Sequence, residues 1–198
     1  MQPYHKYVFD TNNCKFVGKF EEMYQNEDKE KYDSWFQEDL THLGKQISLV
    51  ILNRYNFNSV LDIGCGKGAF THLLKKSNNK VVGVDISETA IMKAKAKYRD
   101  VEFYKLTVDE VLKKEIKWNL IVMYEILSYL DNWKDILEKI SFSCDYIYIS
   151  LYIPPDPIGC VKSFDELKNT INKYFDIVDE LLLNKEAILI LAKVKQVL

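Results

Sequence analysis

Hydrophobic and polar residues follow two different patterns along this chain, and the change comes near residue 58. Residues 1–27 show no regular period and are polar and aromatic. From about 29 to 55 the apolar residues recur at spacings of three and four, which predicts one helix, or two helices divided at Gly44. After residue 58, short apolar runs alternate with helical patterns. We therefore expect a single domain over 1–198, with a helical cap or lid over 1–57 and a core over 58–198.

The core contains apolar runs of strand length, separated by segments with helical spacing. The predicted strands cover 59–63, 80–84, 101–105, 119–124, 146–151, 176–183 and 187–194. The predicted helices cover 68–76, 87–98, 108–114, 133–140 and 163–174. Repeated strand–helix units imply a parallel sheet with helices on both faces, and the final two strands form a hairpin, so one of them runs antiparallel. The predicted fold class is α/β, a Rossmann-like seven-stranded mixed sheet with a C-terminal antiparallel hairpin.

A glycine-rich turn follows the first strand of the core, within residues 60–70. Gly64 and Gly66 let the backbone turn sharply and approach a ligand without obstruction by a Cβ atom. Gly68 opens the next helix, whose N-terminal amides favour negative charge. About twenty residues later Asp85 ends the second strand, where a carboxylate can accept hydrogen bonds from both hydroxyls of a ribose. This strand–helix–strand unit predicts a nucleoside site at the ends of its strands.

The glycines alone leave the nucleoside open, because the spacing from Gly64 to Ala69 also satisfies the relaxed dinucleotide fingerprint. Asp62 stands immediately before the glycine turn. A carboxylate at that position opposes a pyrophosphate but suits an α-amino group. The turn also comes after some sixty residues, whereas dinucleotide domains often begin with it. Both features favour a cofactor that carries an amino acid.

At this point the motifs resemble a known family. The segment 61–68 resembles motif I of the class I S-adenosylmethionine-dependent methyltransferases, 82–87 resembles their second motif, and 119–130 resembles their fourth. The closing hairpin is similar to the family's usual sheet ending, and the likeness covers about 58–194. A narrower similarity, to small-molecule methyltransferases of the nodulation N-methyltransferase type, comes from 124–130 and the aromatic N-terminal extension.

The resemblance implies the cofactor contacts. It places the backbone of Gly64 and Gly66 beside the methionine moiety, with S-adenosylhomocysteine as the product left there. The family often has an acid after the third strand, near the adenine, where this chain has Thr107, so the backbone around 106–108 would hold the adenine instead. The resemblance implies Asp62 at the amino end, Asp85 on the ribose and Ile86 against the adenine. The full expected cofactor-binding set is Asp62, Gly64, Cys65, Gly66, Phe70, Asp85, Ile86, Leu106, Thr107 and Tyr124.

The chemistry then requires a nucleophile held in line with an already activated methyl group, and a base only if the acceptor is protonated. Glu125 directly follows the fourth strand, and Tyr129 lies close behind it. Tyr152 precedes a proline-rich loop, 154–157, that should overhang the site. His5 belongs to an aromatic N-terminal segment that could close over the cofactor. These four residues are the candidate catalytic groups, although core packing, a helix-entry role or a surface position would explain each of them as well.

Composition excludes other classes. The net charge of −2 over 198 residues argues against a duplex-binding protein. No apolar run reaches the length of a bilayer span, and residues 1–6 lack the apolar core of a signal peptide, so a cytoplasmic location is expected. No metal site is expected either, because the cysteines lack Cys-x-x-Cys spacing and nearby histidines. The four cysteines are Cys14, Cys65, Cys144 and Cys160.

We therefore expect a methyltransferase that moves a methyl group to an oxygen or nitrogen of a small metabolite, such as a sugar, a nucleotide-sugar or a phosphate-containing intermediate, with oxygen slightly favoured. The expected partner is that small acceptor, without nucleic acid or membrane, and the protein is expected to be a monomer or homodimer. Three alternatives stay open. They are a non-catalytic S-adenosylmethionine-binding subunit, a small NAD-dependent dehydrogenase, and a methyltransferase acting on protein or RNA.

Overall fold

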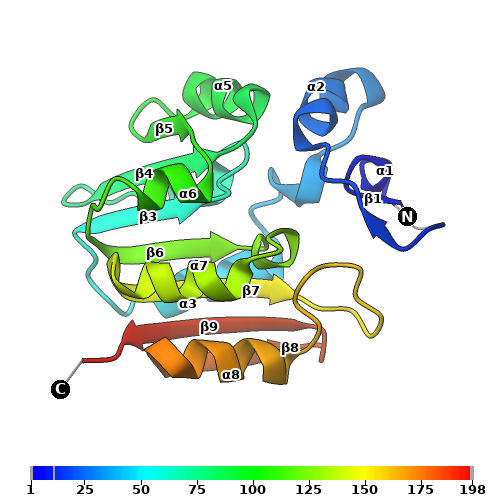
Figure 1. The fold of residues 1–198 in the computed structure, drawn as a ribbon. Coiled ribbons are helices and arrows are strands. Elements are labelled where there is room, and N and C mark those ends of the chain that lie inside the picture. The colour runs from blue at the N-terminus through cyan, green and yellow to red at the C-terminus, as the bar shows by residue number, and fades with distance from the viewer. Residues whose placement is uncertain (1, 11, 197–198) are drawn as a thin grey trace.

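A seven-stranded sheet forms the centre of the protein in the computed structural model, which describes residues 2–10 and 12–196 (Figure 1). Its strand order is β5-β4-β3-β6-β7-β9-β8. The strands are β3 (Ser59–Ile63), β4 (Lys80–Asp85), β5 (Glu102–Lys105), β6 (Trp118–Tyr124), β7 (Cys144–Tyr152), β8 (Phe175–Leu183) and β9 (Ala187–Val194). Neighbours from β5 to β7 pair in parallel, whereas β9 pairs antiparallel with both β7 and β8. The predicted mixed sheet and its closing hairpin are confirmed.

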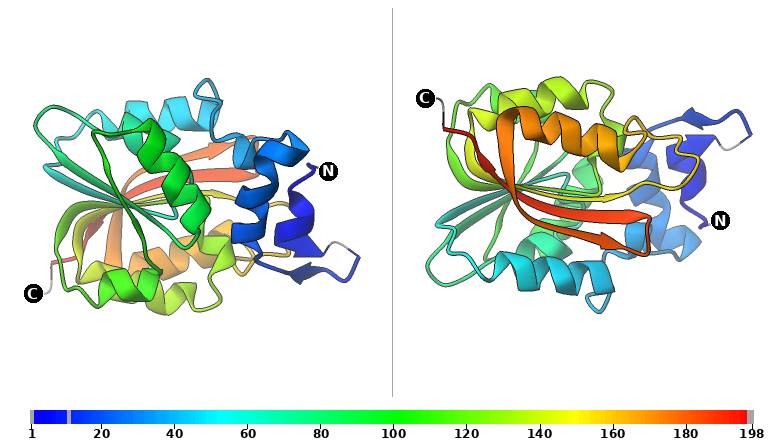
Figure 2. Two further views of the ribbon diagram at one scale, coloured as in Figure 1. Left: turned by 90° about the horizontal axis from the view of Figure 1, so that it is seen from above. Right: turned by 90° about the horizontal axis from the view of Figure 1, so that it is seen from below.

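Helices cover both faces of the sheet, as Figure 2 shows. One apolar cluster joins the sheet to α6 (Val108–Leu112), α7 (Trp133–Ser141) and α8 (Phe164–Tyr174). The cluster on the opposite face includes α3 (Leu43–Leu52), α4 (Ala69–Leu73) and α5 (Glu88–Lys97). On that second face the buried hydroxyl of Tyr148 donates a hydrogen bond of 2.7 Å to Ser48 of α3. Burial of these two faces leaves the carboxyl ends of β3, β4 and β6 as the edge on which a site can form.

The N-terminal segment, meaning the elements from α1 to η1, lies across that edge (Figures 1 and 2). It contains α1 (His5–Val8), the short antiparallel pair β1 (Phe9–Asp10) and β2 (Lys15–Phe16), α2 (Phe20–Glu30) and the 3-10 turn η1 (Ser34–Phe36). The expectation of an irregular 1–27 and helical structure from 29 is therefore wrong. Helix α2 begins at Phe20, and α3 begins only at Leu43.

Contacts made in the folded chain explain this difference. Trp35 and Phe36 both have positive φ, 59° and 49°, so the helix cannot continue through them. The ring of Trp35 lies 5.0 Å from that of Tyr4 and 5.7 Å from that of Tyr129. The ammonium of Lys45 donates to backbone carbonyls of this turn. Tertiary contacts thus override a helical period that is present in the sequence.

The described part of the chain contains neither a membrane-spanning helix nor a cluster of metal ligands. No helix there is long and apolar enough to cross a lipid bilayer. No cluster of three or more histidine, cysteine or acidic side chains there has the geometry to hold a metal ion.

Candidate functional site

The turn after β3 adopts a conformation that only glycine accepts easily. Gly64, Gly66 and Gly68 have φ values of 77°, 53° and 79°. A Cβ atom on Gly64 would lie 2.3 Å from Cγ2 of Ile126, which no real contact tolerates. The backbone amides of Gly64 and Cys65 both donate to the carbonyl of Val84, at 2.8 and 3.0 Å, and so fix the turn against β4. The predicted glycine turn is present and tightly held.

Asp85, at the end of β4, connects the glycine turn to the start of α5. Its Oδ2 accepts from the amide of Gly66 at 2.9 Å, and its Oδ1 accepts from the amide of Ser87 at 2.8 Å. Burial raises the pKa of this carboxyl group, although these bonds oppose the shift. Asp85 therefore stands at the place that the sequence predicted for a ribose contact, and its carboxylate orders the turn as well.

Asp62 stands out in the site because one of its carboxylate oxygens lacks a hydrogen-bond partner among the described residues. The side chain is 2% exposed, and its Oδ2 accepts a hydrogen bond of 2.6 Å from the hydroxyl of Thr71. Its Oδ1 is buried without a hydrogen-bond partner among the described residues. Burial raises the pKa of this carboxyl group to about 7. A buried acceptor without a donor costs about 1–3 kcal/mol, so the position is suited to a ligand that brings a donor, such as an amino group.

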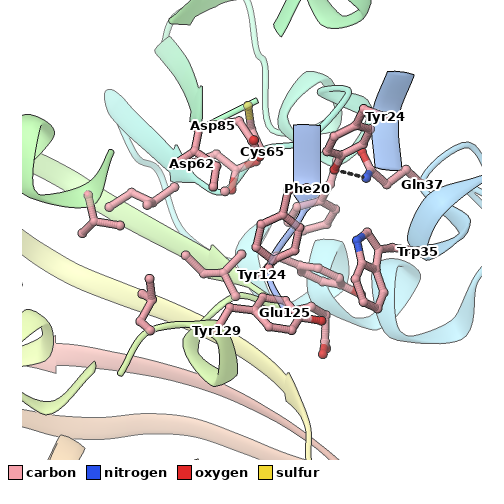
Figure 3. Close-up of a pocket in the computed structure, with 18 of the residues that line it drawn as sticks. Phe20, Tyr24, Trp35, Gln37, Asp62, Cys65, Asp85, Tyr124, Glu125 and Tyr129 are labelled. Atoms are coloured by element: carbon pink, nitrogen blue, oxygen red, sulfur yellow. Dashed lines mark hydrogen bonds between the residues drawn. The ribbon is translucent and has the colours of Figure 1, made fainter. Parts of the chain in front are cut away.

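A cavity of about 330 Å³ lies between the glycine turn and the N-terminal segment (Figure 3). Asp62, Cys65 and Asp85 lie on one side of it, and Tyr24 faces them from α2. We call it the first cavity. Its lining comprises Phe16, Gly18, Phe20, Tyr24, Trp35, Gln37, Lys45, Asp62, Ile63, Gly64, Cys65, Phe70, Asp85, Ile86, Leu106, Val108, Tyr124, Glu125, Ile126, Tyr129 and Leu130. Its volume falls within the range of about 300–1,000 Å³ typical of small-molecule sites.

Most of the predicted cofactor-binding residues line the first cavity, with two exceptions. Gly66 is covered, because a Cβ atom there would lie 2.4 Å from Oε1 of Gln37. Thr107 is exposed and serves as the N-cap of α6, where it forms a capping box with Glu110. The structure therefore gives Thr107 a local structural role, and Leu106 and Val108 on either side of it face the cavity.

Several lining residues come from the N-terminal segment, from α3 and from the loop between them, and sequence reasoning missed five of them: Phe16, Gly18, Phe20, Gln37 and Lys45. Gln37 is held firmly, since its Oε1 accepts from the amide of Lys67 at 2.6 Å and its Nε2 donates to the hydroxyl of Tyr24 at 2.8 Å. No motif signals a lone glutamine in a loop. Tyr24 and Trp35, two aromatic residues of the N-terminal segment, also line the cavity.

Ion pairs fix the N-terminal segment to the glycine turn. The ammonium of Lys67, within the turn, lies 3.0 Å from Oε1 of Glu27 and 2.7 Å from Oδ1 of Asp33. Glu27 is 3% exposed and also pairs with Lys93 of α5 at 2.9 Å. Because both partners of the Lys67–Glu27 pair are buried, the N-terminal segment and the turn form one charged cluster whose members depend on each other.

A larger cavity, of about 650 Å³, adjoins the first. We call it the second cavity. The two cavities share five lining residues, which are Trp35, Lys45, Tyr124, Glu125 and Tyr129. The loop with Pro154 and Pro157 lines the second cavity, as expected of a loop that overhangs the site. Of the candidate catalytic groups, Glu125 and Tyr129 line both cavities, and His5 and Tyr152 line the second.

Glu125 stands at the boundary between the two cavities in a strained conformation, with a φ of 61°. Its Oε1 accepts from the hydroxyl of Ser150 at 2.6 Å, and its Oε2 accepts from the amide of Tyr152 at 2.7 Å. Burial raises the pKa of this carboxyl group, and the two hydrogen bonds oppose that shift. The carboxylate is thus positioned by β7 and presented where the two cavities meet.

Comparison with known proteins agrees with this geometry. Residues 61–144 match a family described as a methyltransferase domain. A ubiquinone biosynthesis O-methyltransferase of Histophilus somni (strain 2336) is 28% identical over 89 residues, which are 40% of this chain and 37% of that protein. The alignment therefore spans little more than a third of that relative's length.

Solved structures show the fold. The N-methyltransferase NodS from Bradyrhizobium japonicum WM9, crystallised with S-adenosylhomocysteine, superposes with a TM-score of 0.71 at 16% identity, over 87% of this chain and 98% of that one. A TehB-like S-adenosylmethionine-dependent methyltransferase from Corynebacterium glutamicum ATCC 13032 Kitasato gives 0.66 at 17% identity, over 87% and 98%. This chain has the class I methyltransferase fold. The predicted family resemblance and fold class are both confirmed.

The residues of the first cavity fit S-adenosylmethionine on their own geometry. The unsatisfied Oδ1 of Asp62 lacks a donor of the kind that an α-amino group supplies. Gly64 of the glycine turn lines the same cavity as Asp62, without a Cβ atom between its backbone and a ligand. Ile86 is 48% exposed although it lines the cavity, so an apolar surface is available to a flat ring.

Proposed function

We propose that the protein is an S-adenosylmethionine-dependent methyltransferase that binds this cofactor in the first cavity and methylates a small molecule held in the second. The buried, unsatisfied Oδ1 of Asp62 beside the glycine turn is the observation that carries the proposal. It favours a ligand with an amino group over one with a pyrophosphate. For that reason it also disfavours the NAD-dependent dehydrogenase.

The chain's own residues would divide the binding among them. Asp62 would accept from the amino group, Asp85 from the ribose hydroxyls, and the apolar side chains of Ile86 and Leu106 would contact the adenine. When bound, S-adenosylmethionine supplies a methyl group already activated by its sulfonium. The protein's contribution is then to orient the acceptor and to exclude water, and orientation alone can be worth about 7–11 kcal/mol.

The second cavity supports an enzyme over a subunit that only binds the cofactor. It meets the first cavity at Glu125 and Tyr129, so an acceptor bound there would lie beside the cofactor. Its enclosure by the N-terminal segment and the loop with Pro154 and Pro157 suits a small molecule better than a macromolecule. The O-methyltransferase and N-methyltransferase among the similar proteins leave either acceptor atom open.

The test is transfer of a radiolabelled methyl group from S-adenosylmethionine to a pool of small metabolites. We expect labelled product from the wild type and a large loss of it in Asp62→Asn. As a matched control, Asp131→Asn alters an exposed aspartate that lines neither cavity and should retain the activity. Cofactor binding without transfer to any fraction of the pool would favour the binding subunit instead. Preferential binding of NAD would overturn the proposal.

A further inference from the structure

Among the described residues that line the second cavity, no lysine or arginine is free to bind a negatively charged acceptor. Lys45 is the only lysine or arginine among the cavity's described lining residues. Its ammonium donates to the backbone carbonyls of Phe36, Gln37 and Asp39, the last two at 3.0 and 2.8 Å. An ammonium has three donors, so all of them are occupied inside the protein. Two histidines, His5 and His42, also line the cavity, and burial lowers the pKa of His5, which favours its neutral form.

Carboxylates, by contrast, line the same cavity. Glu125 lies where the cavities meet, and Asp156 and Glu186 lie elsewhere on the wall. Glu186 accepts a hydrogen bond of 2.9 Å from the hydroxyl of Tyr152, whereas Asp156 is exposed. Glu125 makes no salt bridge with any described residue, and the groups that shift its pKa include no cation. A phosphate placed here would therefore face several carboxylates without compensation.

Several aromatic rings line the same cavity as Glu125. Tyr4, Phe9, Trp35 and Tyr129 all line the second cavity. The ring of Tyr129 lies 6.0 Å from that of Phe9 and 5.7 Å from that of Trp35. Faces of such rings attract ammonium groups, and more strongly where water is excluded. A carboxylate that shares a cavity with several aromatic rings therefore suits an organic cation.

From these observations we propose that the methyl acceptor is the nitrogen of a small, apolar amine bound against Glu125. This inference rests on the proposed function, and it favours nitrogen over the phosphate-containing acceptors that the sequence suggested. The ammonium form would bind and lose one proton to solvent. The nitrogen lone pair would then form a bond to the methyl carbon, while the carbon–sulfur bond breaks and its electron pair stays on sulfur. The methylated nitrogen carries the positive charge that the sulfonium loses.

Three probes that share a benzyl group test the inference: benzylamine, benzyl alcohol and benzyl phosphate. Calorimetry would measure their binding to the protein with and without saturating S-adenosylhomocysteine, at pH 7. We expect benzylamine to bind about tenfold or more tighter than either of the others, because it alone brings a charge-assisted donor to Glu125. Equal or tighter binding of the alcohol or the phosphate to the wild type would overturn the inference.

Glu125→Gln keeps the shape of the side chain and removes its charge, so the preference for the amine should fall to within about threefold. Glu138→Gln is the matched control, since Glu138 is an exposed residue of α7 that lines neither cavity, and it should retain the preference. A preference that survives Glu125→Gln would assign amine recognition to another group and refute the role given to Glu125. Failure of S-adenosylhomocysteine to bind would reject the proposed function, whereas the probe comparison without it would still decide the acceptor class.

Discussion

Replacing Asp62 by asparagine should stabilise the ligand-free protein. The pKa of this buried carboxyl group is raised from 3.8 to about 7. At about 1.36 kcal/mol per pKa unit, its ionisation costs the folded state about 4 kcal/mol above pH 7. The folded state keeps the proton that the unfolded state releases near pH 4, so stability falls as the pH rises from about 4 to about 7. Below pH 4 the group contributes no such difference.

Asparagine removes that cost but introduces another. Its carbonyl can still accept from Thr71, while its NH₂ group stands where Oδ1 of Asp62 has no partner. An unsatisfied buried group costs about 1–3 kcal/mol, so the net gain at pH 8 is about 1–3 kcal/mol. For a chain of this size that corresponds to a rise in Tm of roughly 2–12 °C. Calorimetric scans of the ligand-free protein at pH 8 and at pH 4 would measure it, and the gain should be absent at pH 4.

The same substitution should weaken the binding of S-adenosylmethionine. Loss of a charge-assisted hydrogen bond costs about 1.5–3 kcal/mol, which is roughly a ten- to hundredfold weaker affinity. A substitution that raises stability but weakens binding is characteristic of a residue that is kept for function at a cost in stability. Asp131→Asn, at an exposed position, should alter Tm by no more than about 1–2 °C. Unchanged stability at pH 8, or undiminished affinity, would refute the assignment of Asp62.

Three further changes test other parts of the site. Gly64→Ala should destabilise the fold by about 1–3 kcal/mol in urea titration, because φ is 77° and the new Cβ atom would clash with an isoleucine side chain; an unchanged midpoint would contradict this. Lys67→Met should cost about 1–3 kcal/mol and speed proteolysis of the N-terminal segment, since Glu27 would lose one of the two lysines paired with it; an unaltered cleavage rate would argue against the ionic attachment. Asp85→Asn should weaken S-adenosylhomocysteine about tenfold or more in calorimetry, and equal affinity would misplace the ribose.

The sequence carried enough information to predict the sheet and the glycine turn because both depend on local rules. A short apolar run, such as 119–124, is typical of a buried strand, so each strand can be recognised from its own residues. The turn needs glycine at positive φ, and Asp85 must follow at the end of the next strand. These requirements leave a pattern in the chain, so the sequence predicted the strand positions and several residues that line the first cavity.

The N-terminal part was not predictable in the same way. The helical period across 29–55 is real, yet Trp35 and Phe36 leave the helix because aromatic partners distant in sequence and the carbonyl contacts of Lys45 stabilise another conformation. Gln37 enters the site only through the amide of Lys67, a contact without a local signal. Thr107 was placed in the site by analogy with the family, and its role as an N-cap became visible only with Glu110 beside it.

The most direct test of the central claim is a calorimetric titration of the full chain with S-adenosylhomocysteine and, separately, with NAD. The account predicts that S-adenosylhomocysteine binds with one molecule per chain and that NAD shows no heat of binding at the same concentration. Tight binding of NAD, or no binding of S-adenosylhomocysteine, would contradict the claim that the glycine turn and Asp62 are built for a cofactor that carries an amino acid.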